Sequence, residues 1–341
     1  MSTAPLAVGV AGVGSLGFHH ARHYGSLPEA RLVGVYDTRP ERAAEVAQQL
    51  GTKAFARYED LLDQVEALSI VTPTPDHHAA GMAALKKKKH LLVEKPLAET
   101  IPQAEELVAA ADQAGVVLQT GHIERFNRAV RAAAPHLDKP KYIESDRVAP
   151  FSVHGSDVAV ILDLMNHDLD LVLSLMKEPV ADVRASGIGV LTRQVDIATA
   201  RIEFESGAVA NLTASRLARD RVRKLRIFQP TGYLSLDLSA GTGEFLKLKP
   251  AARAILAVIN ATGTLPNFGA GGGGAPDLSK IIEELKLEAP EGDALALELA
   301  SFVAAARGKQ PVAVSGEEGL EALRLAYRVL EAMGQPARLT A

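Results

Sequence analysis

The chain contains no cysteine, and this absence removes several kinds of chemistry together. Disulfide bonds, thiolate nucleophiles and cysteine metal sites are all excluded over its 341 residues. A chain without cysteine fits a reducing compartment, so we expect a cytoplasmic protein. The length and the apolar fraction of 47% are sufficient for two domains with ordinary hydrophobic cores.

Long apolar runs and an excess of positive charge are also missing. No apolar run reaches the roughly 18 residues that a membrane-spanning helix needs, and residues 1–5 are a short polar lead-in. We therefore expect neither export nor a membrane association. The formal net charge of -4 gives no general attraction to nucleic acid, so no nucleic-acid partner is expected. We interpret the basic run at residues 86–89 as a solvated helix end.

The first third of the chain alternates short apolar runs with helical patterns. This alternation is typical of strand-helix-strand units and a parallel sheet. The expected strands are residues 6–11, 31–36, 67–71, 90–93 and 116–120. The expected helices are residues 15–26, 40–50, 77–87 and 101–114. We therefore predict an α/β protein whose first domain, residues 1–122, is a doubly wound parallel sheet.

After residue 122 the pattern changes. A long helical pattern over residues 157–176 precedes strand-like runs at residues 196–204, 208–215, 224–229 and 232–238. Strands that follow one another without helices indicate an antiparallel or mixed sheet, and turn residues lie between them at 205–207 and 230–232. A glycine-rich segment at 269–274 predicts a flexible loop, and helices near 293–307 and 317–333 close the chain. These runs define a second domain, residues 123–341, whose closing helices could pack back on the first.

Three glycines, Gly12, Gly14 and Gly17, follow the first predicted strand and open a helix. This spacing allows a tight turn and lets a dinucleotide pyrophosphate approach the helix N-terminus, where Ser15 and Leu16 lie. Asp37, at the end of the second strand, would bind ribose hydroxyl groups and repel a 2'-phosphate, which favours NAD over NADP. Arg39 leaves NADP open, because a guanidinium there could pair with that phosphate.

Two further strand ends should line the same crevice. Thr72, Pro73 and Thr74 follow the strand at 67–71, near the nicotinamide, and His77 begins the next helix. We interpret His77 and His78 as helix-start residues that line the cofactor cleft, since no third metal ligand accompanies them. Glu94 and Lys95 emerge at the carboxyl end of the strand at 90–93, where ligands bind in open parallel sheets. Lysine at this place indicates redox chemistry.

Glu94-Lys95-Pro96, the glycine pattern and the motif at residues 163–170 together resemble the glucose-fructose oxidoreductase / inositol dehydrogenase / MocA (Gfo/Idh/MocA) family, over nearly the whole chain. The resemblance implies an N-terminal Rossmann domain that binds NAD(P). It also implies a C-terminal α/β domain with an open mixed, largely antiparallel sheet, which binds the substrate and forms a homodimer or homotetramer. Its catalytic residues correspond to Lys95, Asp163 and His167.

These three residue types suit the oxidation of an alcohol. Asp163 and His167 are four residues apart, so on an α-helix they share one face and the carboxylate could orient the imidazole. An alcohol that loses hydride must also lose a proton, and His167 is our predicted base. Lys95 would then stabilise the developing alkoxide. Lys95 could instead be the base through a lowered pKa, and the sequence does not separate these alternatives.

The segment at residues 121–127 follows a predicted strand and should face the cleft between the domains. With the residues before His167, it resembles family members that oxidise UDP-N-acetylglucosamine at the sugar C3. Arg125 could bind a diphosphate or a sugar hydroxyl, and Asn127 and His122 could contact the sugar. Alternatively, Arg125 pairs with Glu124 or a main-chain carbonyl. The competing functions are an inositol or free-aldose dehydrogenase and a non-catalytic sensor that binds NAD.

One position departs from the family pattern. The turn before the strand at 90–93 usually contains glycine, and this chain has Lys88 there. If Lys88 adopts the left-handed conformation, it costs about 1 kcal/mol.

Overall fold

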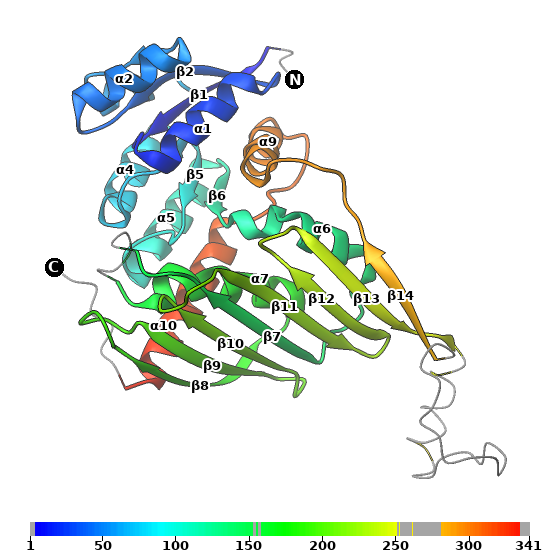
Figure 1. The fold of residues 1–341 in the computed structure, drawn as a ribbon. Helices are drawn as coiled ribbons and strands as arrows, with labels where there is room; N and C mark the ends of the chain where they lie inside the picture. The colour runs from blue at the N-terminus through cyan, green and yellow to red at the C-terminus, as the bar shows by residue number, and fades with distance from the viewer. Residues whose placement is uncertain are drawn as a thin grey trace, which may run out of the picture.

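Two sheets and the helices around them make up the molecule (Figure 1). The computed structural model describes residues 4–334, except residues 153, 154, 156, 157, 251, 253–260 and 262–280. The predicted glycine-rich loop at 269–274 lies outside the described residues. Within them, no helix combines the length and the apolar character that crossing a membrane requires.

The first sheet is parallel throughout, with the strand order β3-β2-β1-β4-β5-β6. Its strands are β1 (Leu6–Ala11), β2 (Ala30–Tyr36), β3 (Lys53–Ala54), β4 (Ala67–Ile70), β5 (His90–Glu94) and β6 (Leu118–Gly121). Its helices are α1 (Ser15–Ser26), α2 (Pro40–Leu50), α3 (Tyr58–Leu62), α4 (Thr74–Lys86) and α5 (Ile101–Ala114). The doubly wound prediction is confirmed. The order reverses between β1 and β4, and this point is where such sheets bind their ligands.

Local signals explain several of these boundaries. Thr100 and Gln103 form a reciprocal capping box at the start of α5, and Gly115 ends the helix with a φ of 65°. Lys88, which follows α4, has a φ of 53°, so the left-handed conformation expected at this turn is present without glycine. The helix α4 begins at Thr74, three residues earlier than predicted, with a proline in its first turn.

The second sheet has the order β14-β13-β12-β11-β7-β10-β9-β8, and only β7 and β10 among its described pairs are parallel. Its strands are β7 (Tyr142–Val148), β8 (Val180–Ile188), β9 (Ile197–Phe204), β10 (Val209–Ser215), β11 (Val222–Gln229), β12 (Gly232–Asp237), β13 (Thr242–Leu248) and β14 (Ile282–Leu287). The prediction of a mixed, largely antiparallel sheet is confirmed. Four of these strands, β7, β8, β13 and β14, were not predicted.

The remaining helices connect and cover the sheets. They are η1 (Ile123–Phe126), α6 (Arg128–Ala133), η2 (Ala134–His136), η3 (Ile161–Met165), α7 (Asn166–Met176), α9 (Ala294–Ala306) and α10 (Gly316–Ala332). The predicted helix over 157–176 is wrong at its start: residues 158 and 159 are not helical, and residue 157 lies outside the described residues. The turn η3 is a π-helix, which runs directly into the α-helix α7.

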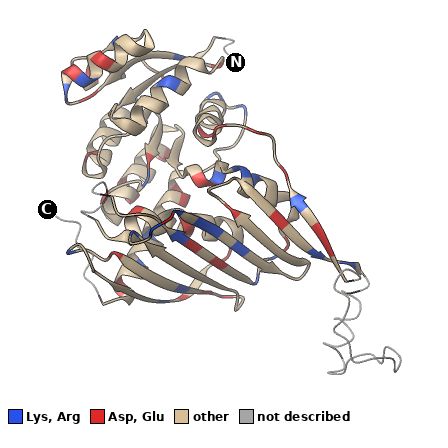
Figure 2. Ribbon diagram, viewed as in Figure 1, with Lys and Arg blue, Asp and Glu red and all other residues tan. Residues whose placement is uncertain are grey.

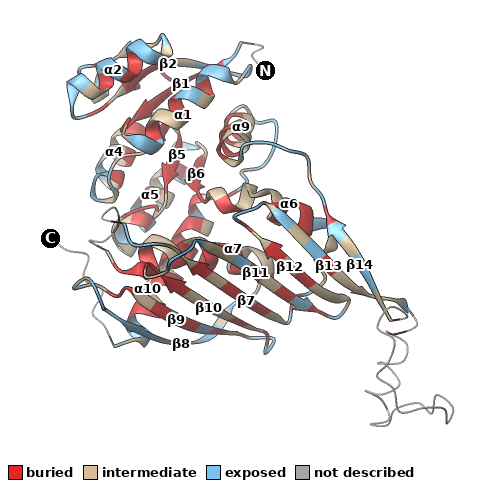
Figure 3. Ribbon diagram, viewed as in Figure 1, coloured by how far each residue is buried: buried red, intermediate tan, exposed pale blue. Residues whose placement is uncertain are grey.

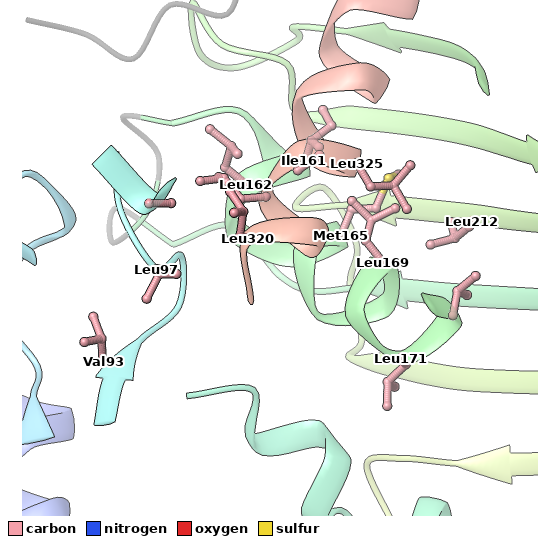
Figure 4. Close-up of a cluster of buried hydrophobic side chains, with 14 of the residues drawn as sticks. Val93, Leu97, Ile161, Leu162, Met165, Leu169, Leu171, Leu212, Leu320 and Leu325 are labelled. Atoms are coloured by element: carbon pink, nitrogen blue, oxygen red, sulfur yellow. The ribbon is translucent and has the colours of Figure 1, made fainter. Parts of the chain in front are cut away.

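The hydrophobic core is continuous between the two sheets. One buried cluster includes Val93 of the first sheet, Leu212 of the second and Met165 of η3 (Figures 3 and 4). The helix α10 contributes Leu320 and Leu325 to this cluster, while α9 packs on α1 in a second one. Helices from the end of the sequence therefore hold the first sheet against the second.

Candidate active site

The glycine turn after β1 has a backbone that only glycine allows. Gly12 has a φ of 82°, and a Cβ atom there would lie 2.6 Å from the Val71 carbonyl oxygen. A Cβ on Gly17 would lie 1.8 Å from the Gly12 oxygen, whereas the space beside Gly14 is open. The helix α1 begins with exposed Ser15 and Leu16, has no side-chain cap and has no acidic residue in its first turn. This open, uncapped N-terminus fits the pyrophosphate of NAD.

Asp37 faces this turn from the end of β2. Its Oδ2 accepts a hydrogen bond from the Val13 amide at 2.9 Å, and its Oδ1 accepts one from the Arg39 amide at 2.9 Å. Burial alone would raise the pKa of Asp37, but these hydrogen bonds outweigh it and lower the pKa. The ionised carboxylate is the group that would hold the ribose hydroxyls. Arg42, which the sequence analysis missed, supports the turn through a 2.8 Å hydrogen bond to the Val13 carbonyl.

The loop after β4 follows the strand that lies next to β1 in the first sheet. Pro73 is exposed, Thr72 and Thr74 are half-buried, and the Thr72 hydroxyl has no hydrogen-bond partner among the described residues. This spare hydroxyl also fits a bound cofactor. His77 is only 1% exposed, and its ring nitrogens each lie 2.9 Å from a main-chain oxygen, those of Thr72 and Pro96. His77 therefore connects the two loops that follow β4 and β5. The sequence analysis had instead predicted that it lines the cofactor cleft.

Lys95 projects from the end of β5 toward the second domain. Its ammonium donates a 2.9 Å hydrogen bond to the main-chain oxygen of Asp163 in η3. Burial lowers the pKa of Lys95 against the opposing attraction of Asp163 and Glu94. Glu94 accepts a 3.0 Å hydrogen bond from His20 of α1, so the residue before Lys95 is held against this helix.

His167 lies at the start of α7, half-buried, with Nδ1 lacking a hydrogen-bond partner among the described residues. Burial lowers its pKa well below 6.5, and the positive charges of Lys95, Arg147 and Arg223 lower it further. The imidazole is therefore neutral and able to accept a proton. The α-helical spacing expected between Asp163 and His167 is replaced by the π-helical turn, and the Asp163 carboxylate lies 4.0 Å from Arg216.

A buried ion-pair network joins β7 to Asp168, the residue that follows His167. Arg147 of β7 donates to both carboxylate oxygens of Asp168 at 2.8 and 2.9 Å, and to Glu124 at 2.8 Å. These three side chains are at most 6% exposed. The sequence analysis did not predict this network: it considered Glu124 only as a partner of Arg125 and gave Arg147 and Asp168 no role.

Two predicted substrate residues are engaged elsewhere. Arg125 makes a paired contact with Asp170 at 2.8 and 2.7 Å and a third with Glu318 of α10 at 2.7 Å. Asn127 donates to Glu124 and to a main-chain oxygen, and its own oxygen caps α6. The polar atoms of both side chains are therefore engaged within the protein, and their predicted contact with a sugar or diphosphate stays a prediction.

His122, the third member of that segment, is 1% exposed, with Nδ1 3.9 Å from Asp170. Burial lowers its pKa, and it is one of the groups that lower the pKa of His167. Lys95, Asp163 and His167 remain as the predicted residues that the fold brings together at the carboxyl edge of the first sheet.

Known proteins share this arrangement of domains. A model described as the NAD-binding Rossmann fold of an oxidoreductase family matches residues 6–122, and one for the GFO/IDH/MocA C-terminal domain matches residues 142–235. A curated relative, UDP-N-acetylglucosamine 3-dehydrogenase from Acidithiobacillus ferrooxidans, is 37% identical over 95% of this chain and 96% of its own. The chain belongs to the Gfo/Idh/MocA family of oxidoreductases.

Two further similarities agree with this assignment. The solved structure of the Acidithiobacillus ferrooxidans enzyme has a TM-score of 0.84 and 35% identity, covering 97% of this chain and 98% of that one. Myo-inositol 2-dehydrogenase from Thermotoga maritima is 27% identical over 94% of each chain. This Gfo/Idh/MocA protein is therefore a NAD-binding oxidoreductase, and the predicted family, fold class and cofactor are confirmed.

Proposed function

We propose that this Gfo/Idh/MocA protein oxidises a secondary alcohol of a sugar, and that its substrate is the nucleotide sugar UDP-N-acetylglucosamine, reacting at C3. The substrate is supported by the 37% identity to a UDP-N-acetylglucosamine 3-dehydrogenase over 95% of the chain. The observation that carries the chemistry is a neutral imidazole, His167, beside Lys95 at the edge of the sheet that binds NAD.

The glycine turn, Asp37 and the Thr72 loop would hold NAD, which would accept the hydride of the alcohol. His167 accepts the hydroxyl proton, because its surroundings keep the ring unprotonated. Lys95 donates a hydrogen bond to the same oxygen and stabilises the negative charge that develops on it. The main-chain oxygen of Asp163 fixes the position of the Lys95 ammonium from the second domain.

The remaining expectations belong to this proposal. We infer a cytoplasmic homodimer or homotetramer with no membrane or nucleic-acid partner. The proposal also includes the roles given above to Lys95 and His167 and a domain boundary after residue 122.

Ligand-dependent thermal stability tests the substrate class without turnover. In the presence of NADH, UDP-N-acetylglucosamine should raise the unfolding temperature, because a ligand that binds only the native state stabilises it. Myo-inositol and glucose at the same concentration should not. Stabilisation by myo-inositol alone would support an inositol dehydrogenase, the activity named for the Thermotoga maritima relative.

Lys95→Ala separates the enzyme from a ligand sensor. This variant should bind NADH as the wild type does and lose turnover by about 10²–10³-fold, since one electrostatic contact to the reacting oxygen is removed. The control is Thr199→Ala, at an exposed side chain of β9. It should keep both NADH binding and turnover. Unchanged turnover in Lys95→Ala would contradict the proposed mechanism.

A further inference from the structure

Two arginines stand directly opposite each other on the second sheet. The antiparallel register of β11 and β7 pairs Arg223 with Arg147. Along β11, Arg223 has the same parity as the buried Leu225 and Ile227, so its side chain projects from the covered face of the sheet. Like charges placed opposite each other across two strands repel and require anions nearby. Figure 2 shows Lys and Arg on these middle strands.

The available anions serve Arg147 rather than Arg223. Arg147 uses Nε and both terminal nitrogens on Asp168 and Glu124. Arg223 reaches only the Glu124 oxygen that Arg147 already occupies, and at a longer distance, 3.4 Å against 2.8 Å. No other hydrogen bond of the Arg223 guanidinium is found in the described part of the chain. Four of its five N–H donors therefore remain available.

The Arg223 side chain is accessible, and through Glu124 and Arg147 it joins the ion-pair network of Asp168, the residue that follows His167. It is 35% exposed, whereas that of Arg216, at the other end of the β10–β11 connection, is 4% exposed and donates to a main-chain oxygen. Burial lowers the pKa of Arg223, as do the positive charges of Arg147 and Arg221. Arg223 is itself one of the groups that act on His167. An added anion at this position would relieve the repulsion among these cations.

We propose that Arg223 binds the diphosphate of the nucleotide-sugar substrate. The inference rests on the proposed function and assigns to Arg223 the role that the sequence analysis considered for Arg125. A planar guanidinium with free donors binds phosphate oxygens in pairs, and its charge is not lost on binding. A neutral polyol offers Arg223 no counter-ion, so the same residue discriminates against inositol and free aldoses.

Calorimetric titration of the NADH-saturated protein with UDP measures this contact without turnover. Arg223→Gln should weaken UDP binding by about tenfold or more, the loss of a charge-assisted contact. Arg223→Lys keeps the charge but loses the paired geometry, so its affinity should be intermediate. The matched control is Lys224→Gln, which removes one positive charge from the next, exposed residue on the opposite face. NADH affinity should be the same in all four proteins.

The outcomes are distinct. UDP affinity that is unchanged in Arg223→Gln, while the wild type oxidises UDP-N-acetylglucosamine, would overturn the inference and leave the proposed function in place. A wild type that binds no UDP and oxidises only neutral sugars or polyols would overturn both. Equal losses of UDP and NADH affinity in Arg223→Gln would show that the substitution disturbs the fold. Arg223→Lys then decides, because wild-type UDP affinity in this variant would overturn the inference.

Discussion

Burial and the charges of the described residues around His167 all lower its pKa, so the imidazole is uncharged at neutral pH. Burial disfavours the imidazolium, and Lys95, Arg147 and Arg223 are all positive. The substrate that we propose brings the compensating negative charge. His167 is therefore available in its unprotonated form at neutral pH, where a histidine with a carboxylate partner would already be partly protonated.

The pH dependence of kcat/KM separates the two possible bases. With His167 as the base, initial rates of oxidation should stay level as the pH falls from neutrality to 6.5 and decrease only below that value, because the pKa is lowered from 6.5. His167→Gln should reduce kcat by about 10²–10⁴-fold. If Lys95 were the base, the rate would instead keep rising with pH above neutrality, until its own lowered pKa is passed.

Glu298 of α9 is a second buried titratable residue near the crevice. Its side chain is fully buried, neither carboxylate oxygen has a hydrogen-bond partner among the described residues, and burial raises its pKa well above 4.5, with Glu94 and Asp170 adding to the effect. The folded protein therefore keeps a proton that the unfolded chain releases above pH 4.5. Its stability falls as the pH rises from there to the raised pKa.

Glu298→Gln should remove this pH dependence. Relative to the wild type, its free energy of unfolding should increase by up to about 1.4 kcal/mol per pH unit over the interval between the two pKa values. Urea denaturation at several pH values measures the difference. Glu291→Gln, at a side chain that is 88% exposed, is the control and should show no such slope. A constant difference across pH would contradict a protonated Glu298.

At the scale of elements, the turn η3 explains why the site could be only partly predicted. The sequence predicts Lys95, Asp163 and His167 as catalytic residues, because their motifs are local and lie beside clear strand and helix patterns. A π-helical turn has no comparable local signal, and in this turn the main-chain oxygen of Asp163 accepts the hydrogen bond of Lys95. Arg125 illustrates the same limit, since its partners Asp170 and Glu318 are 45 and 193 residues away in the chain.

The missed strand β7 has a similar cause. Its inward-facing residues include Ser145 and Arg147 beside Ile143, so the apolar alternation that predicts a strand is absent. Arg147 is tolerated there only because Asp168 and Glu124, from other elements, neutralise it. Sheet order and the buried ion pairs depend on such contacts between distant residues. Most helices and strands of the first sheet, by contrast, follow from local patterns, although β3 and α3 were not predicted.

The turn after α4 provides a test at this scale. Lys88 has a φ of 53°, so Lys88→Gly should stabilise the protein by about 0.5–1 kcal/mol by relieving the left-handed strain. Lys86→Gly is the matched control, because Lys86 is an exposed residue of the last turn of α4 and glycine should destabilise it by a similar amount. Midpoints of urea denaturation measure both effects. Destabilisation by Lys88→Gly would contradict the strained turn.

At the scale of the whole molecule, the shared core joins the NAD-binding sheet to the second one. The cluster that includes Leu91, Met165 and Leu212 crosses from one sheet to the other, and α10 packs into it. Calorimetric unfolding should therefore give one transition, which NADH shifts upward as a whole, by about 2.7 kcal/mol at one hundred times its Kd. Two transitions, of which NADH moved only one, would contradict this coupling.

The appearance of NADH in a mixture of the protein, NAD and UDP-N-acetylglucosamine tests the central claim most directly. The assay should contain a carbonyl trap, because a 3-keto sugar product accumulates unfavourably, and parallel reactions should contain myo-inositol, glucose and other UDP-sugars. We predict NADH formation with UDP-N-acetylglucosamine and none with myo-inositol or glucose. NADH formation with the free polyol or aldose alone, or no reaction with any of them despite NAD binding, would contradict the account.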